Sequence, residues 1–210
     1  MKVIAFNGSP RKDGVSAGGI SIMKDVLEKE GISTEIIHVG NRNIQGCMAC
    51  RKCRDTGYCT IGRKLFKKDI VNECHEKLKA ADGIIIGCPV YYGGIAGTFK
   101  SFLDRLFFPG GDFRYKVAAT VVSLRRTGGI TTYNQLNNYF NLNQMIITPT
   151  AYWNVIHGNS REELNSDEEG CQLMEIQAMN MAWLLKTLAE GKKEIPLPPI
   201  VERKRTNFIR

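Results

Sequence analysis

The sequence has no long hydrophobic run, and this absence limits where the protein can work. No stretch of the 210 residues approaches the roughly 20 consecutive apolar residues that a membrane span needs. Residues 1–20 also lack the apolar stretch and small-residue cleavage pattern of a secretory signal. We therefore expect a cytoplasmic protein that does not associate with membranes.

Two common nucleotide-binding motifs are also missing. A Walker A loop ends in Gly-Lys-Ser or Gly-Lys-Thr, and neither triplet occurs. A dinucleotide fingerprint needs Gly-x-Gly-x-x-Gly after the first strand, but Gly8 has no glycine two positions later. A Walker-type ATP site and NAD bound in the Rossmann manner are therefore disfavoured.

Acidic residues are fewer than basic ones, 21 against 29, which gives a formal net charge of +8. Aromatic side chains are not interleaved with the basic clusters, as a base-stacking surface would require, so we do not expect a nucleic-acid partner. A positive surface that attracts anionic cofactors explains the charge more simply.

Histidine is rare, with three residues in the chain. Because His38, His75 and His157 stand singly, with no carboxylate at a recognisable spacing, we expect no catalytic histidine.

Strand-like and helix-like segments, in contrast, alternate along the whole chain. The continuous apolar runs 83–87 and 117–122 are typical of parallel strands that are covered on both faces. We predict strands at 2–6, 33–39, 83–87, 117–123 and 145–149, and helices at 16–30, 66–81, 96–107, 130–140 and 167–190. This alternation predicts one doubly wound α/β sheet over residues 1–190, followed by an extended basic tail over 191–210.

The loop after the first strand has the features of a phosphate-binding site. A helix follows this loop directly, and the first amides of a helix have no intrahelical acceptor and carry the positive end of the helix dipole. Ser9 and Ser16 add hydroxyl donors, and Arg11 adds a bidentate fork for phosphate oxygens. We therefore predict an anionic, phosphorylated ligand here. The alternative is that Gly-Ser-Pro is only a turn.

Two further loops should meet the first one, because ligands of open α/β sheets bind beyond the carboxyl ends of the strands. The loop 88–95 carries Tyr91 and Tyr92 followed by two glycines, which suits a flat heteroaromatic ring. The loop 124–129 offers amides and arginines that would stabilise the negative charge of a reduced flavin. Two ordinary turns with surface arginines are the alternative.

Three motifs occur in this order: GSPR at 8–11, ADGIIIGCPVYYG at 81–93 and KSFLDR at 100–105. Together they resemble the NADPH-dependent FMN reductase and iron–sulfur flavoprotein family of flavodoxin-like proteins. The resemblance covers residues 1–190. It implies a three-layer α/β/α fold with a five-stranded parallel sheet in the order 2-1-3-4-5. It also implies bound FMN, and a homodimer or homotetramer in which a partner subunit helps to wall the flavin site.

On this resemblance, the FMN phosphate lies in loop 9–17 and the ring lies against 89–94 and 125–129. For the phosphate we name Ser9, Arg11, Ser16 and Ala17. For the ring we name Pro89, Val90, Tyr91, Tyr92, Gly93, Arg126, Thr127 and Gly128. One departure is visible. The family loop often reads Gly-Asn-Thr/Ser where this chain has Gly14-Val15-Ser16, so Ser16 keeps the hydroxyl while Val15 removes a polar contact.

A cysteine-rich insertion at 46–60 places Cys47, Cys50, Cys53 and Cys59 at the spacing C-x2-C-x2-C-x5-C. Four thiolates this close together can hold one [4Fe–4S] cluster, and the spacing resembles the compact motif of the iron–sulfur flavoproteins. Zinc is disfavoured, because structural zinc sites usually split their ligands into two separated pairs. Reduced thiols without a metal are the remaining alternative. We expect the other three cysteines to be packed thiols, at Cys74, Cys88 and Cys171.

These features predict an FMN-dependent NAD(P)H oxidoreductase that passes electrons to a quinone, a nitro or azo aromatic, free flavin or a protein. The flavin would carry the chemistry, so no protein acid or base is expected. Two alternatives remain: an electron-transferring iron–sulfur flavoprotein with FMN and [4Fe–4S], and a non-catalytic carrier of the flavodoxin type. Such carriers are typically acidic, so the charge of +8 counts against the second.

Overall fold

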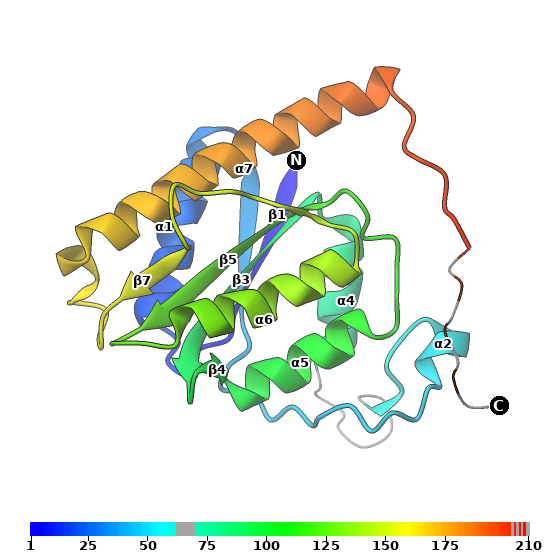
Figure 1. Cartoon of the computed structure of the whole chain (residues 1–210), viewed down its shortest axis with the longest axis horizontal. Coiled ribbons are helices and arrows are strands. Elements are labelled where there is room, and N and C mark those ends of the chain that lie inside the picture. Colours follow the sequence, from blue (N-terminus) through cyan, green and yellow to red (C-terminus); the bar gives the residue numbers. More distant parts are fainter. Residues whose placement is uncertain (62–69, 203, 205, 207, 209–210) are drawn as a thin grey trace.

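A parallel sheet forms the centre of the molecule. The computed structural model describes residues 1–61, 70–202, 204, 206 and 208 (Figure 1). The main strands are β1 (Lys2–Asn7), β2 (Ser33–His38), β3 (Gly83–Tyr91), β5 (Val117–Leu124) and β6 (Ile146–Ile147). They are parallel and lie in the order β2-β1-β3-β5-β6. The order of the five predicted strands is therefore confirmed.

The predicted number of strands was wrong, because the described residues form seven. The predicted fifth strand, 145–149, is reduced to β6, and β7 (Val155–His157) pairs with the other end of β5. Pro149 has no N–H to continue the ladder. Between the two short strands, Asn154 Nδ2 donates to the carbonyl of Thr120, which replaces a missing ladder hydrogen bond. The seventh strand, β4 (Gly94–Ile95), turns back antiparallel onto the end of β3.

Helices cover both faces of the sheet. The described helices are α1 (Val15–Lys29), α2 (Cys53–Thr56), α4 (Val71–Ala80), α5 (Gly97–Phe107), α6 (Gly129–Leu142), the 3-10 turn η1 (Leu164–Ser166) and α7 (Glu168–Glu194). Alternation along β1 divides the core: Val3 and Ala5 pack with α1 and α7, whereas Ile4 and Phe6 pack with α4, α5 and α6. This arrangement confirms the three-layer α/β/α architecture.

The ends of two helices differ from the sequence prediction. The helix predicted at 66–81 begins at Val71 as α4, and residues 66–69 lie outside the described part of the chain. Helix α7 runs through Gly191 to Glu194, and its amino end is capped by Asp167, whose Oδ1 accepts a hydrogen bond from Gly170 N at 3.0 Å. After α7, the described residues form no helix or strand; the carbonyl of Pro198 accepts a hydrogen bond from Arg114 at 3.3 Å.

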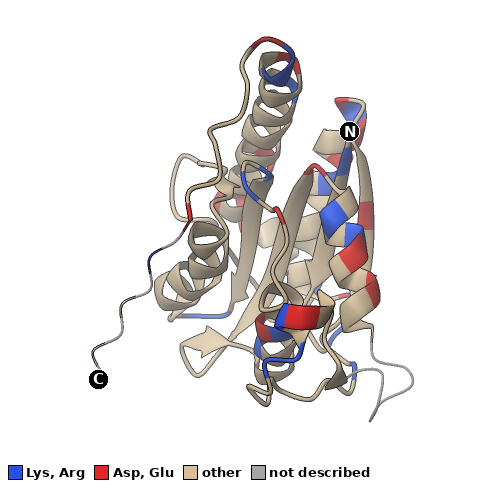
Figure 2. Cartoon of the chain, turned by 90° about the vertical axis from the view of Figure 1, so that its right-hand side faces the viewer, with Lys and Arg blue, Asp and Glu red and all other residues tan. Residues whose placement is uncertain are grey.

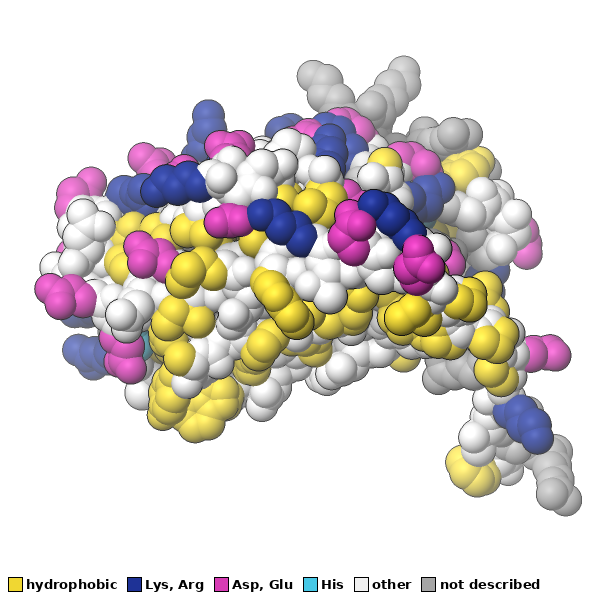
Figure 3. Space-filling view, turned by 90° about the horizontal axis from the view of Figure 1, so that it is seen from above, with side chains coloured by type: hydrophobic (Ala, Val, Ile, Leu, Met, Phe, Trp, Pro, Cys, Tyr) yellow, Lys and Arg dark blue, Asp and Glu magenta, His cyan; other side chains and the backbone are white. Residues whose placement is uncertain are grey.

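The surface carries charge of both signs. On the side seen in Figure 2, basic residues are interspersed with acidic ones and do not form one continuous basic stripe. Seen from above, hydrophobic side chains gather in several patches on the face that α7 crosses (Figure 3). None of the helices in the described part of the chain is long and apolar enough to cross a bilayer.

Candidate flavin site and cysteine cavity

The carboxyl ends of β1, β3, β5 and β7 surround a hollow that contains about 590 Å³ of empty space, part of it open to solvent. This is the edge at which ligands bind in open α/β sheets. The lining residues are Ser9, Pro10, Arg11, Gly14, Val15, Ser16, Pro89, Val90, Tyr91, Ser123, Leu124, Arg125, Gly158 and Asn159. The three loops predicted from the sequence therefore meet at one site, and a fourth segment, after β7, joins them.

The first loop is held in shape by its own polar side chains. Asn7 Oδ1 accepts a hydrogen bond from Ser9 N at 3.0 Å, while its Nδ2 donates to the carbonyl of Lys12 at 3.1 Å. Ser9 Oγ accepts a hydrogen bond from Arg11 N at 3.2 Å. The loop therefore presents the start of α1 to the hollow in a fixed conformation.

The amino end of α1 is open to an anion. Its N-cap residue is Gly14, which has no side chain to occupy the first amides. Within the described part of the chain, α1 has no side-chain cap, and its first turn has no acidic residue. Free amides and the positive end of the helix dipole therefore face the hollow, where a phosphate would satisfy them.

Two contacts join this loop to distant parts of the chain. Arg11 Nη1 donates to the carbonyl of Asn159 at 2.5 Å, which ties the first loop to the segment after β7. Ser16 Oγ lies 2.5 Å from Ser123 Oγ at the end of β5, and both residues are buried. The Ser16 hydroxyl, predicted as a phosphate donor, is thus already shared with a residue that the prediction did not include.

The loop after β3 forms a tight hairpin with β4. Its two central residues, Tyr92 and Gly93, both have positive φ angles, 50° and 71°, as a type I′ turn requires. Tyr91 lines the hollow, whereas Tyr92 is fully exposed at the tip. A Cβ at Gly128 would lie 3.0 Å from the Cα of Gly93, so the loop after β5 packs closely against the hairpin.

Half of the predicted flavin residues line the hollow: Ser9, Arg11, Ser16, Pro89, Val90 and Tyr91. The others lie in the adjoining loops or in α1 without lining it: Ala17, Tyr92, Gly93, Arg126, Thr127 and Gly128. In the loop after β5, the arginine that lines the hollow is Arg125. Gly158 and Asn159 were not predicted, because the strand β7 that precedes them was not predicted either.

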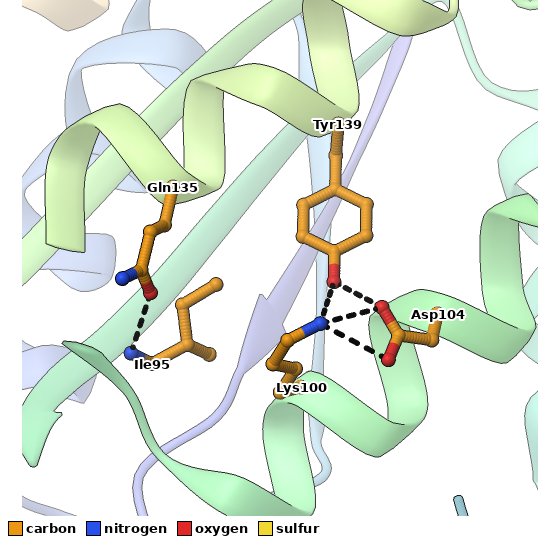
Figure 4. Close-up of polar contacts among 5 residues, drawn as sticks. All are labelled: Ile95, Lys100, Asp104, Gln135 and Tyr139. Carbon is orange, nitrogen blue, oxygen red and sulfur yellow. Dashed lines mark hydrogen bonds and ion pairs between the residues drawn. The ribbon is translucent and has the colours of Figure 1, made fainter. Parts of the chain in front are cut away.

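The hairpin is braced from behind by α6. Gln135 Oε1 accepts a hydrogen bond from Ile95 N at 3.3 Å (Figure 4). Beside it, Lys100 Nζ donates to Asp104 at 2.9 Å and to the hydroxyl of Tyr139 at 3.2 Å, and that hydroxyl also donates to Asp104. Burial and the adjacent carboxylate raise the pKa of Tyr139 well above its ordinary value, so the hydroxyl keeps its proton. These contacts join α5, α6 and the hairpin.

The four cysteines of the insertion all line one small cavity near α2 and the end of α5. Cys53 and Cys59 are buried, and Cys47 and Cys50 are exposed. Cys59 is fixed to α4 by Asn72, which accepts a hydrogen bond from Cys59 N at 2.8 Å and donates to Cys59 O at 2.9 Å. Its thiol sulfur also accepts a hydrogen bond from Arg105 Nε at 3.2 Å.

The environments of these thiols differ. A hydrogen bond with the backbone of Lys52 lowers the pKa of Cys50, whereas burial raises the pKa of Cys53. Outside the cavity, Cys74 and Cys88 are packed in the core, and burial raises the pKa of each thiol to about 12. Those two predictions of packed thiols are confirmed; Cys171 is half-buried.

The donor set of the cavity fits an iron–sulfur cluster. Four cysteines from one short segment line one cavity, and four cysteine ligands are what a [4Fe–4S] cluster requires. In the described residues, no three His, Cys, Asp or Glu side chains are already gathered closely enough to hold a metal ion. The fit therefore rests on the kind and number of ligands that share the cavity.

Comparison with known proteins places the chain in a family. Residues 1–160 match the family described as NADPH-dependent FMN reductase. An iron–sulfur flavoprotein of Methanocaldococcus jannaschii is 37% identical over 161 residues, covering 73% of this chain and 80% of that protein. An iron–sulfur flavoprotein of Methanosarcina thermophila is 28% identical over 198 residues, covering 91% of this chain and 99% of that protein.

Solved structures support the same fold. A structure of RosB with a bound flavin-derived intermediate, 8-demethyl-8-formylriboflavin-5'-phosphate, superposes with a TM-score of 0.72 at 19% identity, covering 100% of this chain and 94% of that one. An archaeal flavodoxin superposes with a TM-score of 0.60 at 13% identity, covering 89% and 99%. These likenesses establish a flavodoxin-like fold. With residues 1–160 matched by its model, the chain belongs to the NADPH-dependent FMN reductase family, and it is similar in sequence to the iron–sulfur flavoproteins.

Proposed function

We propose that this protein is an FMN-dependent oxidoreductase in which electrons pass between FMN at the sheet edge and a [4Fe–4S] cluster held by Cys47, Cys50, Cys53 and Cys59. One observation carries the choice of an iron–sulfur flavoprotein: all four cysteines line a single cavity. The 37% identity to a protein named as an iron–sulfur flavoprotein supports it. From the sequence alone, an iron–sulfur flavoprotein was the alternative to a simple NAD(P)H reductase. The cavity that the four cysteines share favours the iron–sulfur flavoprotein.

The hollow fits FMN in position and in chemistry. It lies at the sheet edge where ligands bind in open α/β folds, and its lining combines serine, arginine and tyrosine side chains. For the phosphate we propose the amides at the start of α1, including that of Ala17, with Ser9, Arg11 and Ser16. For the ring we propose the segments 89–93 and 126–128, joined by Arg125 from the wall of the hollow. FMN, when bound, supplies the redox chemistry.

The residues of this chain bind and orient the cofactor. Arg11 and the α1 amides compensate the phosphate charge, and the contact between Arg11 and Asn159 keeps the guanidinium beside the first loop. The hairpin between β3 and β4 holds Tyr91 against the hollow, and Gln135 fixes that hairpin. Positive charge from Arg125 and Arg126 favours a reduced, anionic ring.

We also propose NAD(P)H as an electron donor and a small aromatic or a protein as the acceptor. Tyr91 lines the hollow and is about half exposed, so its ring could stack against a planar donor or acceptor. The family name specifies NADPH, which supports the choice of donor. The site of action that we propose is the cytoplasm, where reduced thiols persist.

A homodimer or homotetramer completes the proposal. Large hydrophobic side chains stay exposed on α7, at Met179 and Trp183, and in the loop before β7, at Tyr152 and Trp153. Exposed apolar groups of this kind are typical of surfaces that bind other protein chains. Light scattering of the purified protein would give the mass of the assembly, and a monomer at micromolar concentration would contradict this part of the proposal.

The experiment that tests the function is anaerobic purification followed by absorption spectroscopy and assays of flavin, iron and acid-labile sulfide. We expect FMN bands, and iron and sulfide at the level of one [4Fe–4S] cluster per FMN. Cys53→Ser should remove most of the iron and leave the FMN. Cys171→Ser is the matched control, because Cys171 lies on α7 outside the cavity, and it should keep both.

Different failures would have different meanings. FMN without iron or sulfide would reject the cluster and return the protein to the simple reductases. Failure to bind FMN even after reconstitution would reject the whole proposal. If neither NADH nor NADPH bleached the flavin without oxygen, the nicotinamide donor would be excluded.

A further inference from the structure

Arg105 is an unusual residue for its position in the fold. It lies on α5, where the other inward-facing side chains are apolar, including Phe102, Leu103 and Leu106. Its exposed fraction is 1%, and it is the only Lys, Arg, Asp or Glu that is buried in the described part of the chain. Because burying a guanidinium is costly unless its donors are satisfied, such a residue needs specific partners.

Its partners point into the cysteine cavity. Nε donates to Cys59 Sγ at 3.2 Å, and Nη1 donates to the carbonyl of Gln45, two residues before Cys47, at 3.0 Å. Arg105 lines the cavity together with all four cysteines. The guanidinium therefore bridges the two ends of the cysteine-rich segment, and the contact with Gln45 fixes the plane from which Nε reaches the sulfur.

We propose that Arg105 is a positioning residue that raises the reduction potential of the cluster through its hydrogen bond to Cys59. This inference rests on the proposed function, because it needs the cluster at the four cysteines. Reduction adds one negative charge to the cluster, and that charge spreads onto the sulfur ligands. A buried cationic donor on one ligand stabilises the reduced state more than the oxidised one, and hydrogen bonds to sulfur are a recognised control of such potentials.

The other basic residues of the segment are less suited to this role. Arg54 is exposed, and its guanidinium lies over the ring of Phe108 at 5.9 Å. Water screens an exposed charge, so its effect on a nearby redox centre is small. Arg54 therefore provides a matched control: it lies next to Cys53 in sequence and has the same charge, but it is exposed where Arg105 is buried.

The test is a redox titration of the anaerobically purified holoprotein, with the cluster followed by electron paramagnetic resonance. Arg105→Met should lower the cluster potential by about 60 mV, which corresponds to a tenfold change in the one-electron equilibrium. Arg105→Lys keeps the positive charge but loses the planar set of N–H donors. The cluster potential of this variant should therefore lie between those of Arg105→Met and the natural protein. Arg54→Met should leave the cluster potential unchanged. The FMN potential should be the same in every variant as in the natural protein.

The outcomes separate this inference from the proposed function. A natural protein without iron would reject the proposed function and this inference together. An unchanged potential in cluster-loaded Arg105→Met would overturn only the inference. Loss of the cluster in both Arg105→Lys and Arg105→Met would assign Arg105 to holding the loop and would also overturn it. Loss in Arg105→Met alone, with a lowered potential in Arg105→Lys, would support it.

Discussion

The hydroxyl oxygens of Ser16 and Ser123 lie 2.5 Å apart, although the two residues are 107 positions apart in the sequence. Ser16 belongs to the first turn of α1, and Ser123 lies near the end of β5. Both are buried beneath the hollow proposed for FMN. The contact therefore fixes the distance between the proposed phosphate end of the site and the strand that leads into the loop of Arg125 and Arg126.

Removing one member of this pair should affect both stability and cofactor binding. Ser123→Ala leaves the buried Ser16 hydroxyl without that partner, so we expect the free energy of unfolding to fall by about 1–3 kcal/mol. FMN should dissociate more readily, because Ser16 can then rotate away from the phosphate. Urea unfolding and fluorescence titration with FMN would measure the two effects.

Ser21→Ala is the control for this substitution. Ser21 also lies on α1, but its hydroxyl donates to the carbonyl of Ala17 on its own helix at 2.9 Å, and Ser21 does not line the hollow. It should leave FMN affinity unchanged. Equal losses of FMN affinity in the two variants would show that the Ser16–Ser123 contact has no special part in the site.

A second prediction concerns the close approach of Gly40 to the first loop. A Cβ at this position would lie closer than 3.0 Å to the backbone of Ser9 and Gly8, and backbone atoms cannot rotate away. Gly40→Ala should therefore push the loop out of place and lower stability by about 1–3 kcal/mol. It should also weaken FMN binding, measured by the same titration, because Ser9 and Arg11 move with the loop.

The matched glycine is Gly191. It lies within α7, and a Cβ there would have nothing within 4 Å. Alanine is the better helix former, so Gly191→Ala should raise the free energy of unfolding by about 0.5–1 kcal/mol. If Gly40→Ala were as stable as the natural protein, the loop would have more room than the structure gives it.

The order of the sheet could be predicted because its central strands are defined by local sequence. Residues 83–87 and 117–122 are continuous apolar runs, and each is buried on both faces in β3 and β5. Three of the four segments of the hollow could also be placed, because each follows a predicted strand and ends at the same edge. The alternation of strands and helices was sufficient for this.

The remaining features depend on contacts between distant residues. Asn154 continues the edge of the sheet by reaching Thr120, so the split of the last strand had no local signal beyond Pro149. Asn159 enters the site only because β7 pairs with β5. Arg105 belongs to the motif at 100–105, which carries no sign of its burial, and only the packing of α5 against the cysteine cavity shows that it is buried.

His75 should make the free energy of unfolding depend on pH. Its ring is buried against Phe113, with Nδ1 2.8 Å from the carbonyl of Leu106, and burial lowers the pKa of His75 below its ordinary value of 6.5. The unfolded chain therefore takes up a proton at this residue at a higher pH than the folded protein does. The contribution of His75 to stability is complete above pH 6.5 and declines as the pH falls below it, by at most about 1.4 kcal/mol per pH unit.

His75→Asn isolates this effect, because the asparagine amide can still donate to Leu106 but does not titrate. Urea unfolding at intervals between pH 7.5 and pH 5 would give the free energy of unfolding for both proteins. We expect the advantage of the natural protein over the variant to shrink as the pH falls below 6.5. A difference that stayed constant with pH would contradict the prediction.

The split edge of the sheet leads to the last prediction. Asn154 is completely buried, and its Nδ2 donates both to the carbonyl of Thr120 and to Oε1 of Gln177. Asn154→Ala would deprive these two buried acceptors of that donor and should cost about 2–4 kcal/mol. The loss should appear in urea unfolding as a lower midpoint with an unchanged slope, since the unfolded state exposes the same surface.

Asn180 supplies the comparison for this substitution. Its Nδ2 also donates to a backbone carbonyl, that of Pro149, at 3.0 Å, but this contact is exposed on α7. Water can replace a hydrogen bond at the surface, so Asn180→Ala should cost well under 1 kcal/mol. If both asparagine variants lost the same stability, the carbonyl of Thr120 would have another donor, and Asn154 would not be the residue that joins β6 and β7 into one edge.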